Sequence, residues 1–461
     1  MGSKRRLRNG IILSLTVVVS FILGVLSPFE IKRKDDDGLD MFEEIYNVLK
    51  TNWYYGEDED MIMRAIEALY TNPEDPFTFL MEPSTSVMDT VSGKGIGITI
   101  SDYGGWILVE EVYNGDNRMN LKVKDIITSV DGKDLSGKTF AEASAILSNT
   151  VSSKNSFNVQ ILRDGVEKTV ELVVGEFNDN ITVSLIEANE DYLAVKIDEF
   201  GSTTGTEFGK FLKDYGTASN LIIDLRGNPG GYITSVINVA SYLMPNGRPV
   251  MSVMDRDDNG ATYKTSNESY YTFNHIYVMV DKDSASGAEA LAITLKENAE
   301  VIEGLNVTVV GQSTYGKGTA QQDYVLSNGY VIHCTYAKWY SPNGVNINGI
   351  GVLPTTGYEL SYIDYEEYYY SYTLLEFGDQ NEQVLRLQYM LKYMGYEDVR
   401  CHGYFDELTE AAVKDIQTNN SLSINGKVNI NTFNFIKRAM VDKKLEQSEK
   451  EFDFVVDLIG D

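Results

Sequence analysis

The sequence is poor in cysteine and histidine, and this scarcity excludes several kinds of chemistry. Its two cysteines, Cys334 and Cys401, lie far apart, so we expect two unpaired thiols and a fold that does not depend on disulfides. No cluster of Cys and His has zinc-ligand spacing, so no metal site is expected. The three histidines, His275, His333 and His402, lie outside the segments with turn or oxyanion chemistry, which argues against a Ser-His-Asp triad.

Positive charge is also scarce. Lys and Arg number 39 against 68 Asp and Glu, a net charge of −29, which argues against a nucleic-acid partner because phosphate binding needs clustered positive charge. The exception is the N-terminus, where basic residues within 1–9 precede an apolar run. Residues 10–29 can cross a bilayer as one helix, with residues 1–9 in the cytoplasm and the rest of the chain outside the cell membrane. A cleaved signal peptide is the alternative, although no small-x-small cleavage site is evident.

The rest of the chain divides by its hydrophobic pattern. Apolar residues repeat at helical spacing over 39–70, and the following segment changes to strand-like runs broken by Gly and Asp. Beyond it, short apolar runs suit buried strands, and helical segments follow them. We therefore expect an N-terminal helical region at 30–90, a strand-rich unit at 91–176, an alternating α/β unit at 177–365 and a helical unit at 366–440. The acidic tail at 441–461 is charged, and we expect it to be poorly ordered apart from a possible short helix.

The first segment with chemical potential is 221–231, Leu-Ile-Ile-Asp-Leu-Arg-Gly-Asn-Pro-Gly-Gly. It is an apolar strand that reaches Asp224 and Arg226 and then breaks into a glycine-rich turn. Glycines such as Gly230 and Gly231 allow backbone amides to face a cavity, and amides held this way can stabilise an oxyanion. A tight strand-to-helix turn with a structural ion pair explains the same pattern equally well.

The second segment is 281–290, Asp-Lys-Asp-Ser-Ala-Ser-Gly-Ala-Glu-Ala, which follows an apolar strand and opens a helix. A serine on such a turn exposes its hydroxyl, and the amide after it can join an oxyanion hole. In isolation, the default interpretation is a capping box, in which Ser286 caps the helix and Glu289 is its reciprocal partner.

The third segment, 309–321, is a near match to a phosphate loop. Gly318 stands where that motif needs a Ser or Thr to reach magnesium, so nucleotide binding is the weakest hypothesis. Lys317 can instead act as a neutral general base, because burial depresses the pKa of a lysine and Ser–Lys pairs are a known variant of nucleophilic catalysis.

Taken in this order, the three segments resemble the carboxyl-terminal processing peptidases, the S41 family of serine proteases. Residues 224–231, 284–289 and 311–321 match the three motifs of that family, although the serine-to-lysine spacing is longer than usual. The resemblance implies the following roles: Ser286 as nucleophile, Lys317 as base, Gln321 to orient the lysine, Gly287 with Gly230 and Gly231 for the oxyanion hole, and Asp224, Arg226 and Glu289 as supporting residues.

Two flanking units carry resemblances of their own. The strand-rich unit resembles a PDZ domain at residues 124–132, which implies a carboxylate-binding loop of Gly95, Ile96, Gly97 and Ile98 before an edge strand. Arg163 could sense a bound peptide across the domain boundary, but an exposed turn arginine is the simpler interpretation. Residues 377–440 resemble the small helical peptidoglycan-binding domain, and a packing module that has lost sugar binding is the alternative.

The expected fold is an α/β S41 protease core with an inserted, β-rich PDZ domain, an N-terminal transmembrane helix and a small C-terminal helical domain. The resemblance implies a single-pass cell-membrane serine endopeptidase, homo-oligomeric and with peptidoglycan as a further partner. It would cleave extracytoplasmic proteins after PDZ capture of their C-termini, through an acyl-enzyme and with no cofactor. Two alternatives stay open: a non-catalytic, wall-tethered scaffold that captures C-termini, and a hydrolase of peptidoglycan peptides.

Overall fold

A computed structural model of the chain describes residues 38–52, 61–82, 92–113, 117, 120–178, 182–357 and 370–460. The chain divides into two compact units, residues 1–79 and 80–461, which are described separately. The predicted transmembrane segment and its cytoplasmic flank lie outside the described residues. Within the described ranges, no helix is both long enough and apolar enough to cross a membrane.

The first unit contains two amphipathic helices, α2 (Gly38–Asn52) and α3 (Met61–Tyr70), which confirm the prediction of helices over 39–70. Their apolar residues are not fully covered: Met41 and Ile45 of α2 are more than half exposed, and Leu69 of α3 is 84% exposed. A short strand, β1 (Phe79–Met81), lies at the boundary between the two units. An apolar face is therefore present on this unit.

The centre of the second unit is a six-stranded sheet in the order β10-β11-β12-β15-β16-β19. Its first strand pair is antiparallel and the other pairs are parallel, as the alternation of short apolar runs with helices predicts. The strands are β10 (Val183–Ala188), β11 (Tyr192–Ile197), β12 (Asn220–Asp224), β15 (His275–Val280), β16 (Val307–Gly311) and β19 (Thr356–Gly357). The helices between them are α5 (Thr204–Tyr215), α6 (Ile233–Leu243) and α7 (Gly287–Ala299).

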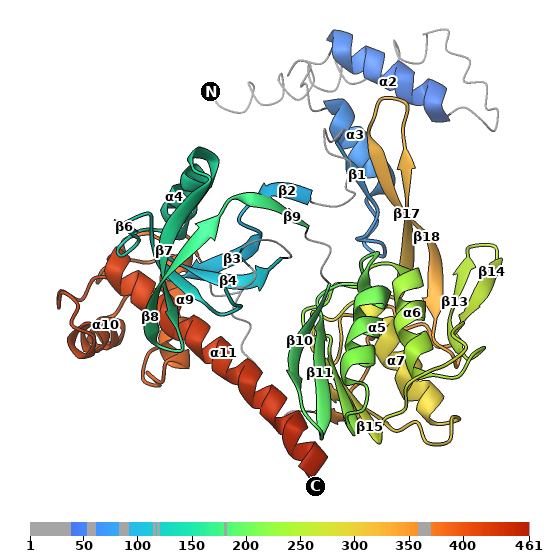
Figure 1. Cartoon of the computed structure of the whole chain (residues 1–461). Coiled ribbons are helices and arrows are strands. Elements are labelled where there is room, and N and C mark those ends of the chain that lie inside the picture. The colour runs from blue at the N-terminus through green and yellow to red at the C-terminus, as the bar shows by residue number, and fades with distance from the viewer. Residues whose placement is uncertain are drawn as a thin grey trace, which may run out of the picture. The chain divides into compact units, whose positions relative to one another are not determined.

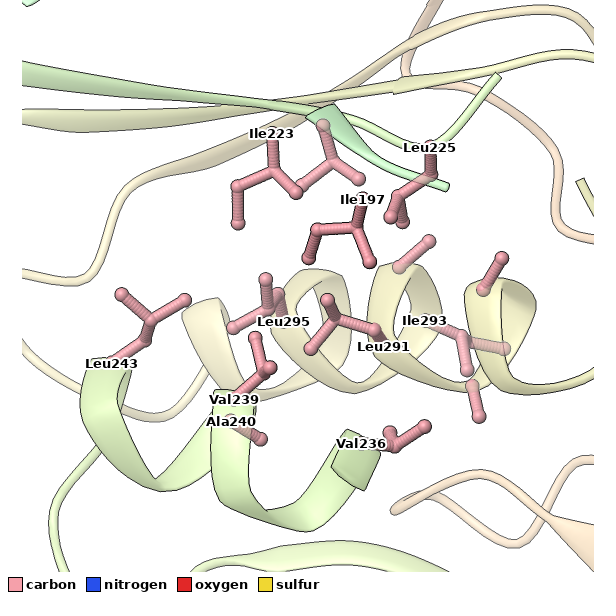
Figure 2. Close-up of a cluster of buried hydrophobic side chains, with 14 of the residues drawn as sticks. Ile197, Ile223, Leu225, Val236, Val239, Ala240, Leu243, Leu291, Ile293 and Leu295 are labelled. Carbon is pink, nitrogen blue, oxygen red and sulfur yellow. The ribbon is translucent and has the colours of Figure 1, made fainter. Parts of the chain in front are cut away.

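One face of this sheet packs on helices (Figure 1). Alternate strand residues point to opposite faces, so Leu193, Val195 and Ile197 share this core. Figure 2 shows Ile197, Ile223 and Leu225 facing side chains of α6 and α7. At roughly 25 cal/mol for each Å² of apolar surface removed from water, this buried layer is the main source of stability for the centre of the unit.

The opposite face packs on the end of a long C-terminal helix, α11 (Ile430–Gly460), which is one continuous helix (Figure 1). Tyr192, Ala194 and Ile222 of the sheet contact a cluster that includes the fully buried Val455. The prediction of a poorly ordered tail at 441–461 is therefore wrong. Its apolar residues form a helical stripe that dense surface charge obscures, at Val441, Leu445, Phe452, Val455 and Ile459.

A second, antiparallel sheet contains the strand order β17-β18-β13-β14. Its strands are β13 (Pro249–Asp255), β14 (Gly260–Lys264), β17 (Thr319–Val325) and β18 (Val331–Tyr340). These hairpins were not predicted from the sequence; β14, for example, is exposed along its whole length and lacks an alternating apolar pattern. The β17–β18 hairpin begins at Thr319, within the third motif, and so fixes the end of that segment.

The strand-rich unit confirms the strands predicted from 92 to 175. Its sheet has the order β3-β4-β5-β7-β8, so β3 lies at an edge, and helix α4 packs on β4 and β5. The elements of this unit are β2 (Ser92–Gly95), β3 (Ile98–Tyr103), β4 (Trp106–Val112), β5 (Ile126–Val130), β6 (Lys133–Asp134), α4 (Phe140–Ser153), β7 (Ser156–Arg163), β8 (Val166–Val173) and β9 (Gly175–Asn178).

The predicted helical unit contains α9 (Glu382–Tyr393), α10 (Glu407–Asn419) and the first turns of α11 around one apolar core. Asn381 caps α9 by accepting a bond from the Val384 amide, and Asp406 caps α10 in the same way. Both cysteines of the chain are free thiols, as predicted.

Candidate active site

The carboxyl ends of β12 and β15 carry the first two motifs, and this edge of a parallel sheet is the usual place for a site in an α/β fold. The turn after β12 is held by Asn228, which is fully buried. The side-chain amide of Asn228 donates to the carbonyl oxygen of Ile197 at 2.8 Å. The backbone carbonyl oxygen of Asn228 accepts from the Ala285 amide at 2.8 Å. Asn228 therefore fastens the glycine-rich turn to the serine-containing turn.

The turn after β15 is organised by Asp281. One carboxylate oxygen, Oδ1, accepts bonds from the amides of Gly227 at 2.9 Å, Asp283 at 3.0 Å and Ser284 at 2.9 Å. Ser284 is fully buried, and its hydroxyl donates to the Leu225 carbonyl oxygen at 2.8 Å. Of the two serines in the motif, Ser286 is the one that is partly exposed.

Ser286 has a backbone conformation that is rare for a residue with a side chain. Its φ is 49° and its ψ is −108°, immediately before α7 begins at Gly287. Such a conformation costs on the order of 1–3 kcal/mol and persists only where the surroundings enforce it. Strain of this kind on a strand-to-helix turn is typical of an exposed nucleophile.

The two turns touch through their glycines. A Cβ atom at Gly230 would lie 2.7 Å from the Gly287 nitrogen and 2.7 Å from the Ser286 Cβ, and Gly230 has a φ of 107° that favours glycine. The Gly230 amide already donates to the Asn228 side chain at 2.8 Å, so it is not available to a substrate, unlike the amide of Gly231. Within the described residues, the amides of Gly231 and Gly287 donate to no acceptor. They form a pair of donors beside Ser286.

Glu289 connects the second and third motifs. Its side chain is fully buried and accepts four bonds. Oε1 accepts from the Thr314 hydroxyl at 2.5 Å and the Gly316 amide at 2.6 Å, and Oε2 accepts from the amides of Ser286 at 2.7 Å and Lys317 at 2.8 Å. A capping box accounts for the bond with Ser286 but not for the other three. One carboxylate thus joins the backbone of the serine turn to the backbone of the lysine loop.

The segment that carries Lys317 is an irregular loop between β16 and β17. A phosphate loop leads into a helix, so the strand that follows this loop removes the structural context for nucleotide binding. The Lys317 carbonyl oxygen accepts from the indole of Trp339 at 2.9 Å, and the lysine side chain is partly exposed. The amide nitrogen of Gln321 donates to the hydroxyls of Thr319 at 2.8 Å and Thr335 at 3.1 Å, which fixes the orientation of this side chain.

Asp224 and Arg226 form a buried ion pair. The Arg226 Nε and Nη2 donate to the two oxygens of Asp224 at 2.9 and 2.7 Å. Burial would raise the pKa of Asp224, but the positive charges of Lys196 and Arg226 outweigh burial and lower the pKa to about 2. The carboxylate therefore stays ionised at neutral pH.

Several residues that shape the site were not singled out from the sequence. Asn228, Asp281 and Thr314 lie inside the matched motifs, so their position was the available signal. Glu451 accepts a bond from Arg226 at 2.6 Å across 225 residues of sequence, and nothing in the sequence indicates that pairing. Arg163 is not an exposed turn residue, because it forms a partly buried ion pair with Asp125 at 2.6 Å.

Comparison with known proteins gives the family. Residues 191–357 match the model of peptidase family S41, and residues 380–436 match that of a peptidoglycan binding domain. The carboxy-terminal processing protease CtpA of Bacillus subtilis is 27% identical over 490 aligned positions, which cover 99% of each chain, and CtpB of the same organism is 26% identical over 434 positions, covering 89% of this chain and 87% of the other. The solved photosystem II D1 C-terminal processing protease is 23% identical and covers 70% of this chain and 87% of the other, with a TM-score of 0.40. The chain therefore contains a serine peptidase domain of family S41 and a C-terminal domain of the peptidoglycan-binding family, and along its length it is similar to carboxy-terminal processing proteases.

Proposed function

We propose that the chain is an endopeptidase that uses a dyad of Ser286 and Lys317. The neutral Lys317 amine accepts the Ser286 hydroxyl proton while Oγ attacks the scissile carbonyl carbon. The amides of Gly231 and Gly287 bind the oxyanion of the tetrahedral intermediate. Its collapse breaks the peptide bond, and Lys317 returns the proton to the leaving amine. Water, deprotonated by Lys317, then attacks the acyl-enzyme and regenerates the Ser286 hydroxyl.

The observation that carries this proposal is the carboxylate of Glu289. Its Oε2 atom accepts from both the Ser286 and Lys317 amides, so the serine and the lysine are attached to one rigid, buried point. A dyad needs its base within hydrogen-bond reach of its nucleophile, and a shared backbone acceptor supports that geometry. The two free amides beside Ser286 support an oxyanion hole at the same place.

Cleavage of an unfolded protein by the full-length chain tests the dyad. We expect the parent to cleave, and Ser286→Ala and Lys317→Ala to lose at least about 10³-fold in rate while keeping the parent's thermal transition. Ser219→Ala is the matched control, because Ser219 is exposed and immediately precedes β12, at the opposite edge of the sheet from the carboxyl ends that carry the site. Full activity of Ser286→Ala would contradict the proposal.

A chain that is inert in all forms would fit the scaffold alternative instead. Addition of peptides with free C-termini then decides the question, because a peptidase that requires an activator gains activity and a scaffold does not. Cleavage of purified wall peptides, but not of unfolded protein, would favour the peptidoglycan hydrolase alternative. The match of residues 380–436 to a peptidoglycan binding domain is the reason to test it.

We further propose that the strand-rich unit is a PDZ domain that captures substrate C-termini. Edge strand β3 can accept a peptide as an added strand, and the predicted carboxylate-binding segment runs from Gly95, the last residue of β2, through Ile96 and Gly97 to Ile98, the first residue of β3. Gly97 has a φ of 65°, which lets a backbone turn sharply beside a terminal carboxylate. A peptide with a free C-terminus should bind more tightly than its amidated form, and equal affinities would refute the assignment.

The remaining proposals concern location and partners. We propose that residues 10–29 anchor the chain in the cell membrane, that the catalytic part is extracytoplasmic, and that residues 380–436 bind peptidoglycan. The exposed apolar residues of α2 support a homo-oligomer. Protease accessibility in intact cells, sedimentation with purified cell wall and the mass of the chain in solution test these points separately. Protection from external protease, no co-sedimentation or a monomeric mass would each refute one of them.

A further inference from the structure

The C-terminal helix α11 contacts two different parts of the second unit. Near its middle it packs on the strand-rich unit, where Asp442 accepts a bond from the Tyr103 hydroxyl and Arg438 lies 4.2 Å from the centre of the Trp106 ring. Near its end it covers one face of the six-stranded sheet through Val455. The helix is therefore built into the unit along its length.

Between those two contacts, α11 reaches the turn that builds the candidate oxyanion hole. Glu451 Oε2 accepts from Arg226 Nη1 at 2.6 Å, and the Ser448 carbonyl oxygen accepts from the same nitrogen at 3.1 Å. The side chains are little exposed, 12% for Arg226 and 11% for Glu451. Asp224 holds the other side of the guanidinium, so Arg226 is clamped between a strand end and a helix.

Arg226 is also the first residue of the glycine-rich turn. Its carbonyl oxygen accepts from Lys196 Nζ at 2.8 Å, and the next amide, that of Gly227, donates to Asp281. The turn then continues through Asn228 to Gly231. A clamp on Arg226 thus fixes the start of the turn whose far end carries the proposed oxyanion donor.

A cavity with many charged side chains in its lining also lies between α11 and the two turns. It has a volume of about 700 Å³ and is lined by Arg226, Gly227 and residues 281–283 from the two catalytic turns. Ser448 and Glu451 of α11 line the same cavity. Residues of both turns and residues of α11 therefore line one cavity.

We infer that Glu451 is a positioning residue of the peptidase, which acts through Arg226 to hold the Gly231 amide where the oxyanion forms. The inference rests on the proposed Ser286–Lys317 mechanism. It makes the C-terminal helix part of the catalytic apparatus rather than only a tether for the small helical domain. A displaced oxyanion donor slows acylation without weakening capture of the substrate, because the donor acts in the transition state.

The test compares Glu451→Gln with the parent in the full-length chain. We expect kcat to fall about 10- to 100-fold with KM within about twofold, and the rate of Ser286 labelling by a fluorophosphonate to fall in parallel. Glu446→Gln is the matched control: it makes the same change on the same helix, but Glu446 pairs with Lys450, and both side chains are about 60% exposed. The control should match the parent in both assays.

A double-mutant cycle of Glu451→Gln and Arg226→Gln distinguishes an effect of Glu451 through Arg226 from a general effect on how α11 packs. If Glu451 acts through Arg226, adding Glu451→Gln to Arg226→Gln lowers kcat by less than about twofold more. Independent, multiplying losses would overturn the inference, as would parental kcat in Glu451→Gln. Should Glu451→Gln lose its thermal transition, Glu451→Asp makes the same test, since it keeps the charge but shortens the reach to Arg226.

Failure of the mechanism itself would look different. An active Ser286→Ala variant would refute the dyad whatever Glu451→Gln does. An inactive Ser286→Ala beside a fully active Glu451→Gln would refute only the role of Glu451.

Discussion

The serine turn at 281–289 and the last turns of α11 both complete the same six-stranded sheet, but they do so through different interactions. The turn is built from small residues and directed hydrogen bonds, with one buried carboxylate, Glu289, that accepts four donors. The end of α11 contributes apolar side chains such as Val455 and a single buried ion pair from Glu451. The difference suggests that changes in the turn act mainly on catalysis, whereas changes at the end of α11 act mainly on stability, with Glu451 as the exception.

Among the changes that test this comparison, Gly230→Ala in the glycine-rich turn has the largest expected effect. The added Cβ would lie 2.7 Å from both the Gly287 nitrogen and the Ser286 Cβ, so the two turns must separate. We expect kcat/KM to fall by about 10²- to 10³-fold, the cost of losing an oxyanion donor. Gly247→Ala is the control, because Gly247 also has a positive φ but no atom lies near its Cβ position. Equal activity of Gly230→Ala and Gly247→Ala would contradict the expectation that changes in the turns act mainly on catalysis.

A slightly smaller loss is expected for Glu289→Gln. Both oxygens of the Glu289 carboxylate accept hydrogen bonds, and glutamine replaces one of them with an NH₂ group, which cannot accept. At least one buried amide or hydroxyl would therefore lose its acceptor. We predict about 100-fold lower kcat/KM and a loss of roughly 2–4 kcal/mol of unfolding free energy. Glu297→Gln, at the other end of α7, changes a carboxylate that accepts from Ser341 and Asn343, and it should leave kcat within about twofold. Steady-state kinetics and thermal denaturation measure both effects.

On the α11 side, Val455→Ala should change stability without changing catalysis. Val455 is fully buried against the sheet, so the truncation leaves a cavity and costs about 2 kcal/mol of unfolding free energy. The exposed neighbour Asp457 offers the control Asp457→Ala, for which we expect a change within about 0.5 kcal/mol. Denaturant unfolding distinguishes them. A Val455→Ala variant as stable as the parent would mean that this end of α11 does not cover the sheet in solution.

The smallest effect concerns acid. Because the pKa of Asp224 is lowered to about 2 in the folded chain, its ionised form stabilises the fold at any pH above the ordinary range for Asp, and this contribution is lost as the pH falls from about 4 toward about 2. Between pH 6 and pH 3 the parent should lose on the order of 1 kcal/mol more than Asp224→Asn, which cannot titrate. Unfolding free energies at several pH values test this. Parallel pH dependences of the two proteins would mean that the Asp224–Arg226 pair is not formed.

The sequence predicted one of these two regions far better than the other. Strands such as β11 and β12 were predicted because buried strands are short apolar runs, and Ser286 and Lys317 were identified because their segments match family motifs. The end of α11 was missed because charged residues interrupt a stripe that has helical spacing, from Val441 to Ile459.

Contacts distant in sequence were beyond prediction for a physical reason. Glu289 was expected to support the site, but its bonds to the Lys317 loop depend on how α7 packs against that loop, which spacing alone does not determine. The pairing of Arg226 with Glu451 depends in turn on where a C-terminal helix docks. The hairpin of β13 and β14 was missed because its exposed outer strand has no apolar alternation.

The central claim is that Ser286 becomes the covalent nucleophile because Lys317 removes its proton. The most direct measurement is mass-spectrometric mapping of the full-length chain after reaction with a fluorophosphonate. We predict a single adduct on Ser286, formed at least about 10²-fold more slowly in Lys317→Ala, with Ser284 unmodified. An adduct on another residue, or labelling of Ser286 at the same rate without Lys317, would contradict the account.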